Sequence, residues 1–128
     1  MGNILFSLFL TVASFSIFIT THRVNGINRA LYNIPISIFE SSIPLAQESD
    51  EPIVYYDKEV LESKLTSYFK KELVKYTNRY NVSYYYYEQS DKSVCTSDYC
   101  SAVEITVTAR ITLEMRYQKS ASFYIQKN

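Results

Sequence analysis

Apolar side chains occupy every second position from Val103 to Tyr117, with Thr, Glu and Arg between them. Because side chains alternate faces along a strand, this run is predicted to be a β-strand with one dry face and one wet face. A strand of this length would extend about 50 Å, longer than most strands. We therefore expect a bend or bulge near Ala109-Arg110, or two neighbouring strands that each pair with part of the run.

Two further segments are expected to pair with this strand. Residues 81–89 form a tyrosine-rich segment with aromatic side chains on both faces, and residues 121–126 show a short apolar alternation. Turn-forming polar residues bound both segments, with a turn predicted over residues 118–120. We expect an antiparallel meander in which the run from Val103 is central, paired early with residues 81–89 and late with residues 121–126.

A helical pattern covers Asp57 to Tyr76. Asp57 is suited to cap the first turn, and early acidic and late basic residues complement the helix dipole. Apolar residues recur at helical spacing and make one face, which we expect to pack on the sheet. That face comprises Val60, Leu61, Leu65, Tyr68, Phe69, Leu73 and Tyr76.

The N-terminal segment from Gly2 to Thr21 contains no charged residue, and Arg23 ends the apolar run. Twenty helical residues span about 30 Å, the thickness of the hydrocarbon core of a bilayer. A signal peptide is the alternative, but it normally has a basic start, a shorter apolar core and a small-x-small cleavage site. The segment shows none of these features, so we favour an uncleaved membrane anchor.

Ser7, Thr11 and Ser14 lie on one face of this predicted anchor helix. Small hydroxyl residues allow helices to approach closely in lipid, which makes this face a candidate assembly surface. Alternatively, each hydroxyl donates to a carbonyl of its own helix and needs no partner.

The helix is expected to continue to Asn33, because Pro35 disfavours helical geometry at the residue before it. Alternating Ile residues then predict a short edge strand over residues 34–38, and the polar residues 40–52 predict a surface connection. The chain is thus predicted to be α+β: an N-terminal transmembrane helix, then an amphipathic helix packed on a three-stranded antiparallel β-meander.

We divide the chain into three parts on these grounds. Residues 1–34 form the anchor helix with its extramembrane extension, residues 35–56 form a linker, and residues 57–128 form a small α+β domain.

The net charge and the missing catalytic motifs argue against several classes of function. The chain has 13 Lys+Arg and 13 Asp+Glu, so it lacks the basic excess typical of nucleic-acid binders, and we expect no nucleic-acid partner. Motifs for nucleotide binding, zinc peptidases and serine hydrolases are missing, and the single His22 has no predicted acid or nucleophile partner. We expect no enzymatic activity, no cofactor and no bound metal.

Cys95 and Cys100 are the only cysteines and lie in a polar loop. Two thiols cannot complete a structural zinc site, whereas their spacing suits a disulfide that closes the loop. In a reducing compartment both would remain free thiols. We favour the disulfide, on the condition that the domain is exported.

The sequence carries opposing signals about membrane sidedness. Arg23 and Arg29 follow the predicted span, and the positive-inside rule would keep that side cytoplasmic. A disulfide and the sequon Asn81-Val82-Ser83 favour the opposite side. We expect an extracytoplasmic domain.

Four consecutive tyrosines, Tyr84, Tyr85, Tyr86 and Tyr87, alternate between the two sheet faces. One alternate pair should pack under the helix, and the other is then partly exposed and forms a candidate binding surface for a flat ligand. Cross-strand packing against Thr and long charged side chains is the simpler role, and we favour it.

The layout of an apolar N-terminal helix that continues beyond the membrane and leads to a small antiparallel sheet resembles type IV pilin-like and TadE-like minor pseudopilins. The Cys95–Cys100 loop is similar to the disulfide loops of some pilins, and Gly2 stands where a prepilin peptidase would cut. Members usually have Glu at the fifth mature position, where this chain has Ser7. The resemblance implies a minor subunit of a pilus-like or secretion apparatus that packs through its anchor helix.

We therefore expect a single-pass, membrane-anchored structural or assembly subunit, whose partners are the lipid bilayer and other membrane or pilus-like subunits. The alternative is a secreted or tethered binding module whose exposed sheet tyrosines bind a peptide or glycan. A small enzyme is the third hypothesis, and it would require a cleft lined with titratable groups.

Overall fold

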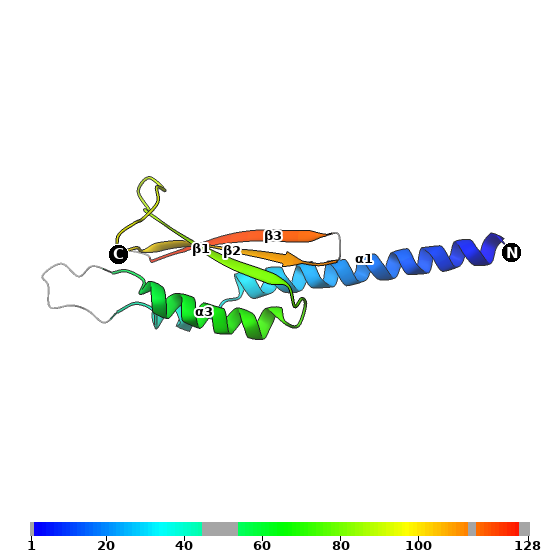
Figure 1. Ribbon diagram of the computed structural model, residues 1–128, viewed down its shortest axis with the longest axis horizontal. Helices are drawn as coiled ribbons and strands as arrows, with labels where there is room; N and C mark the ends of the chain where they lie inside the picture. Colours follow the sequence, from blue (N-terminus) through cyan, green and yellow to red (C-terminus); the bar gives the residue numbers. More distant parts are fainter. Residues whose placement is uncertain (1, 45–53, 113–114, 126–128) are drawn as a thin grey trace, which may run out of the picture.

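The computed structural model describes the backbone of residues 2–44, 54–112 and 115–125, and the side chains of those residues from Ile17 onward. Three strands form one antiparallel sheet in the order β1-β2-β3. This confirms the predicted α+β class and the three-stranded meander with its central second strand. In chain order the elements are α1 (Gly2–Tyr32), α2 (Ile36–Glu40), α3 (Lys58–Leu73), β1 (Tyr80–Tyr87), β2 (Ala102–Arg110) and β3 (Arg116–Tyr124) (Figure 1).

The long alternating run proves to be parts of two strands rather than one. β2 ends at Arg110 and β3 begins at Arg116, and these two residues pair in register. Residues 118–120, predicted as a turn, lie within β3. The predicted division of β2 into an early half paired with one strand and a late half paired with the other is wrong, because β1 and β3 each pair along nearly all of β2. The pattern concealed the turn because the alternation keeps the same phase on both sides of it: Ile111 and Tyr117 still lie on the side of the core.

The dry face of β2 is as the alternation predicts. Val103, Ile105 and Val107 are fully buried, whereas Glu104 and Thr106 between them are half-buried. Helix α3 lies over this face and buries Leu61, Leu65, Phe69 and Leu73. As predicted, Asp57 caps α3: its carboxylate accepts from the amide N–H of Val60 at 3.3 Å. The helix ends at Leu73, three residues before the predicted Tyr76.

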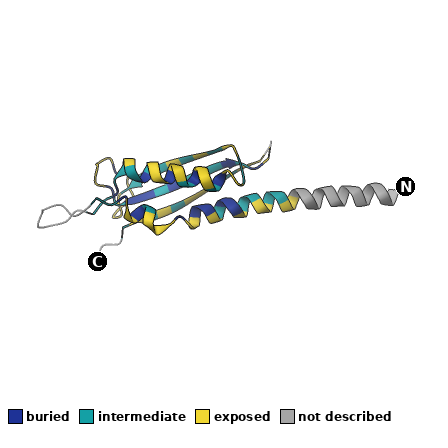
Figure 2. Cartoon of the chain, turned by 90° about the horizontal axis from the view of Figure 1, so that it is seen from below, coloured by how far each residue is buried: buried dark blue, intermediate teal, exposed yellow. Residues whose placement is uncertain are grey.

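The C-terminal part of α1 belongs to the same core. Ile27 and Leu31 are fully buried, and Tyr68 of α3 donates from its hydroxyl to the carbonyl oxygen of Ala30 at 2.8 Å. Helix α1 packs near β3 and α3 packs near β1, so the two helices share one face of the sheet (Figure 2). We call this unit, from Val24 onward, the head.

The edge strand predicted over residues 34–38 is wrong. Residues Ile36–Glu40 form the short helix α2, which begins directly after Pro35. Proline is tolerated at a helix start because its missing N–H would have no helical partner there. Phe39 of α2 is buried and stacks on Phe123 of β3 with ring centroids 4.7 Å apart, so tertiary packing decides the local conformation.

Helix α1 extends beyond the sheet toward the N-terminus (Figure 1). Ile17 and Phe18, the first of its described side chains, are each 67% exposed. Within the described residues, no helix combines the length and apolar character needed to cross a membrane. The anchor predicted over residues 2–21 falls mainly on residues 2–16, whose side chains lie outside the described part, as do the side chains of Ser7, Thr11 and Ser14.

Candidate functional site

No helix in the described part of the chain covers the other face of the sheet, which we call the open face. Its residues are the ones that alternate with the core positions, and cross-strand register aligns them in rows. Thr106 and Ser120, for example, are directly opposite and their hydroxyl oxygens lie 2.7 Å apart. The side chains on the open face are Asn81, Ser83, Tyr85 and Tyr87 of β1; Glu104, Thr106, Thr108 and Arg110 of β2; and Arg116, Gln118, Ser120, Ser122 and Tyr124 of β3.

Tyrosines gather at one end of the open face. The rings of Tyr85 and Tyr87 stack with centroids 6.3 Å apart and 17° between their planes. Tyr85 is 42% exposed and Tyr124 is 55% exposed. A shallow hollow of about 410 Å³ is lined by Tyr85, Tyr87, Lys92, Glu104, Ser122 and Tyr124. Sequence reasoning missed Tyr124, which only the register of β3 with β2 brings to this row.

Tyr84 and Tyr86 are the pair that packs under the helix, as one of the two predicted arrangements requires. The hydroxyl of Tyr86 donates to the carboxylate of Glu62 on α3 at 3.3 Å. Burial, together with the nearby charge of Glu62, raises the pKa of Tyr86. The hydroxyl of Tyr84 is buried and has no hydrogen-bond partner among the described residues. These two tyrosines therefore serve the core rather than a binding surface.

The predicted disulfide is present between Cys95 and Cys100, whose Cα atoms lie 6.0 Å apart. Both ends of its loop are held by the head. The amide of Cys95 donates to the carbonyl of Tyr86 at 2.9 Å, and the amide of Tyr56 donates to the carbonyl of Cys100 at 2.8 Å. The loop thus joins β1 to the segment that precedes α3.

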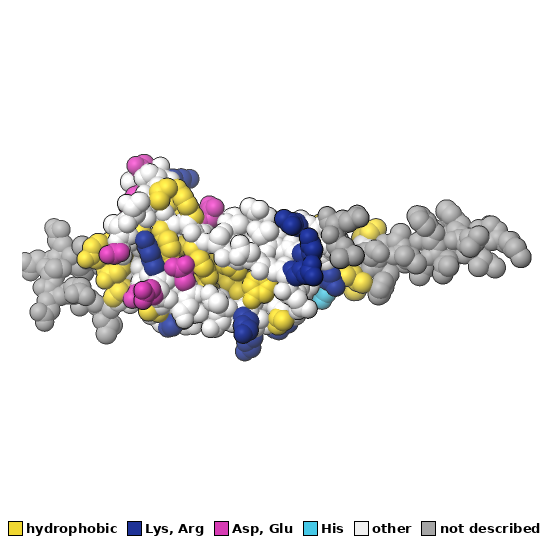
Figure 3. All heavy atoms as spheres, viewed as in Figure 1, with side chains coloured by type: hydrophobic (Ala, Val, Ile, Leu, Met, Phe, Trp, Pro, Cys, Tyr) yellow, Lys and Arg dark blue, Asp and Glu magenta, His cyan; other side chains and the backbone are white. Residues whose placement is uncertain are grey.

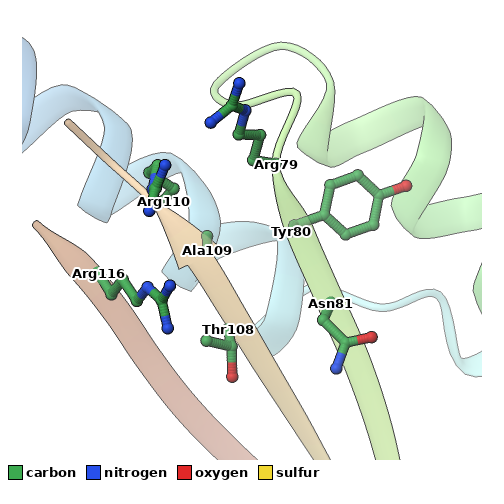
Figure 4. A pocket seen from close by; sticks show the side chains of 7 residues that line it. All are labelled: Arg79, Tyr80, Asn81, Thr108, Ala109, Arg110 and Arg116. Atoms are coloured by element: carbon green, nitrogen blue, oxygen red, sulfur yellow. The ribbon is translucent and has the colours of Figure 1, made fainter. Parts of the chain in front are cut away.

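The end of the open face opposite the tyrosines is basic. We call Arg79, Arg110 and Arg116 the arginine cluster; with Tyr80, Asn81, Thr108 and Ala109 they line a second hollow of about 320 Å³ (Figure 4). The amide of Arg110 donates to the carbonyl of Arg79 at 2.8 Å, and Arg116 is the register partner of Arg110. The guanidinium of Arg23 on α1 donates to the carbonyl of Ile111 beside this cluster. Sequence reasoning missed the cluster because Arg79 is distant along the chain and because the turn that brings Arg116 opposite Arg110 was not recognised.

The side chains that line these two hollows are mainly aromatic, cationic and hydroxyl-bearing. Aromatic faces and guanidinium groups line them, and His22 lines neither hollow but lies against the ring of Tyr76 at 5.5 Å. In the part of the chain that is described, no three His, Cys, Asp or Glu side chains gather as a metal site. Comparisons with protein families, curated proteins and solved structures found no match to this chain.

Proposed function

We propose that this chain is a membrane-anchored structural or assembly subunit, in which α1 is a single-pass transmembrane anchor and the head is an extracytoplasmic α+β domain. The proposal depends chiefly on one observation: a single continuous helix both builds the core of the head and extends beyond it. Leu31 is fully buried in the head, whereas Phe18 is largely exposed. The charge-free residues 2–21 supply the apolar surface that such a helix would place in lipid.

The disulfide supports an outward-facing head. Disulfides persist in oxidising compartments and are rare where glutathione keeps thiols reduced. Both cysteines of the chain are engaged in this bond, and both are buried. A head held together by this bond suits the extracytoplasmic side of the membrane.

Two surfaces support a role in assembly. β3 pairs with β2 on one side, and no other strand of the described chain pairs with its second side. Such an edge offers backbone donors and acceptors to a strand of another subunit. In the anchor, Ser7, Thr11 and Ser14 are the candidate face for close helix packing. A minor subunit of a pilin-like or secretion apparatus, the layout that the chain resembles, would use both surfaces.

Membrane anchoring is tested by fractionating cells that produce the full chain and washing the membranes with alkaline carbonate. We expect the wild type to stay in the membrane pellet. The double variant Leu10→Lys/Val12→Lys, near the centre of the charge-free run, should be released to a large extent, because a lysine costs up to about 3 kcal/mol at the centre of a membrane helix. Ile36→Lys, which changes an apolar side chain of the head that is 72% exposed, is the matched control and should stay in the pellet. Release of the wild type by the wash would refute the anchor.

Assembly is tested by crosslinking intact membranes and then purifying the chain in a mild detergent. The proposal predicts that other membrane subunits co-purify with it. A chain that is monomeric with and without crosslinker would contradict a structural role.

A binding module is the second candidate, and the hollow beside Tyr85 and Tyr124 favours it. Stacked, exposed tyrosines suit the apolar faces of sugars or peptide side chains. The wild type should bind a spot on a glycan or peptide array. The variant Tyr85→Ser/Tyr124→Ser should lose this binding while its unfolding midpoint stays that of the wild type. The paired control Tyr84→Phe, under the helix, should keep this binding.

A further inference from the structure

The arginine cluster lies at the end of the head from which α1 extends. Figure 3 shows Lys and Arg side chains gathered at that end, next to apolar side chains of the helix, while the Asp and Glu side chains on the same side of the molecule lie toward the other end. The chain as a whole has a net charge of zero. On the side of the molecule shown in Figure 3, both signs of charge occur at the far end, whereas the end toward α1 shows Lys and Arg.

The arginine cluster brings like charges close together, and their repulsion lowers the stability of the sheet. Arg110 and Arg116 are directly opposite on neighbouring strands, and like charges in this relation destabilise a sheet. Among the described residues the one ion pair joins Glu72 of α3 to Lys75, two residues after the helix ends, so no described carboxylate forms an ion pair with the cluster. Glu114 lies outside the described residues. An anion supplied from outside the chain would relieve the repulsion, and guanidinium groups suit phosphate oxygens in particular.

The position of the cluster along α1 indicates which phosphates it would meet. Arg23 contacts Ile111, which directly follows Arg110. Arg23 comes five residues after the exposed Phe18, which is about 7.5 Å along a helix axis. The headgroup layer on each side of a bilayer is about 5–8 Å thick. If Phe18 stands at the edge of the hydrocarbon, Arg23 and the neighbouring cluster stand at the depth of the lipid phosphates.

We propose that the arginine cluster docks on the phosphates of anionic lipid headgroups, and that this contact holds the head against the membrane surface. The inference depends on the proposed function, because it requires α1 to enter a bilayer. Continuity between the exposed apolar side chains of α1 and the cluster distinguishes a lipid surface from a soluble anion.

The test measures the distance of the cluster from the lipid surface in the full chain. Asn78→Cys places one thiol next to Arg79, and both native cysteines are bonded, so a fluorescent maleimide labels this position alone. The labelled chain is placed in nanodiscs that contain nitroxide-headgroup lipid, with phosphatidylcholine alone or mixed with phosphatidylglycerol. Ser90→Cys, in the loop after β1, is the reference position.

We expect the label at position 78 to be quenched at least about threefold more strongly when phosphatidylglycerol is present, and this difference to vanish at high salt. The label at position 90 should not respond. Arg79→Gln/Arg110→Gln/Arg116→Gln should remove the difference, whereas the corresponding Lys variant should retain most of it. Lys58→Gln/Lys64→Gln/Lys92→Gln removes the same charge from parts of the head farther from the end from which α1 extends and should leave the difference intact.

The outcomes separate the two proposals. A chain that does not enter nanodiscs overturns the anchor and this inference together. A chain that enters them, but is quenched equally with and without phosphatidylglycerol, overturns the inference alone. Inorganic phosphate is the remaining probe. Because it offers the same oxygens as a headgroup, it should compete for the cluster and relieve the quenching more than chloride does at equal ionic strength. Relief no greater than that by chloride would show only general charge attraction and would overturn docking on phosphates.

Discussion

Gly26 of α1 lies directly against the ring of Tyr76, three residues after the end of α3. A Cβ atom built at Gly26 would overlap Cε1 and Cζ of that ring, closer than any real contact. A glycine inside a helix costs about 1 kcal/mol relative to alanine. Here it allows the aromatic ring to pack against the backbone of α1, so the apparent weak point of the helix is where α1 and the end of α3 meet.

We therefore predict that Gly26→Ala destabilises the head by about 1 kcal/mol, because displacing the ring outweighs the gain in helix propensity. In a Tyr76→Ala background the same substitution should stabilise it by up to about 1 kcal/mol. Denaturant unfolding of the full chain in mild detergent, followed by near-ultraviolet circular dichroism, gives both values. Equal effects of Gly26→Ala in the two backgrounds would show that the ring does not matter.

Removing the hydroxyl of Tyr68 and removing that of Tyr84 should have different effects on the free energy of unfolding. Tyr68→Phe removes a hydrogen bond to the carbonyl of Ala30 and should cost about 1 kcal/mol. Tyr84→Phe removes a buried hydroxyl that has no partner among the described residues, and should be neutral or stabilising. The same unfolding measurement compares them. A larger loss for Tyr84→Phe than for Tyr68→Phe would contradict the packing of α3 described above.

Reducing the disulfide should lower the stability of the head without unfolding it. Closing a loop this short is worth about 2 kcal/mol by loop-closure entropy, and the backbone bonds of Cys95 and Cys100 remain after reduction. We expect the unfolding midpoint to fall on addition of a phosphine reductant. Cys95→Ser/Cys100→Ser should start from the lower midpoint and show no response. A midpoint that does not move in the wild type would mean that the bond contributes nothing to stability.

The stability of the head should fall in alkaline solution. Burial, with a smaller effect of Tyr87, raises the pKa of Tyr56 from 10.0 to about 12. As the pH rises, the Tyr56 hydroxyl loses its proton in the unfolded chain before it does so in the folded head, and this favours unfolding. The free energy of unfolding is therefore unaffected by Tyr56 below about pH 10 and falls as the pH rises from 10 to 12. Tyr56→Phe should reduce the slope of unfolding free energy against pH in this range. The exposed Tyr85→Phe is the control, and an equal reduction there would contradict the assignment.

Local patterns predicted the parts of the fold that depend on local physics. The alternation at Val103, Ile105 and Val107 specifies a half-buried strand, and Asp57 specifies the start of α3 because its carboxylate has nearby amides to accept from. Helix α2 was missed because Phe39 gains more from stacking on Phe123, which follows far along the chain, than a strand would provide. Propensity is a weak guide where tertiary burial competes with it.

The surfaces were harder to predict than the fold. The placement of the exposed Tyr85 and the half-buried Tyr87 on the open face follows from alternation, but Tyr124 joins them only through the register of β3. The arginine cluster likewise needs the turn after Arg110, which brings Arg116 opposite to it. Because the apolar alternation runs through that turn in phase, the sequence alone did not reveal it.

The central claim is that α1 anchors the chain in a membrane with the head outside the cell interior, and thiol labelling of intact cells tests it most directly. The two native cysteines are bonded, so the wild type gives no background, and Ser90→Cys adds one exposed thiol to the head. A membrane-impermeant maleimide should label Ser90→Cys in intact cells, and the labelled chain should sediment with membranes. Labelling only after lysis, or labelled chain in the soluble fraction, would contradict it.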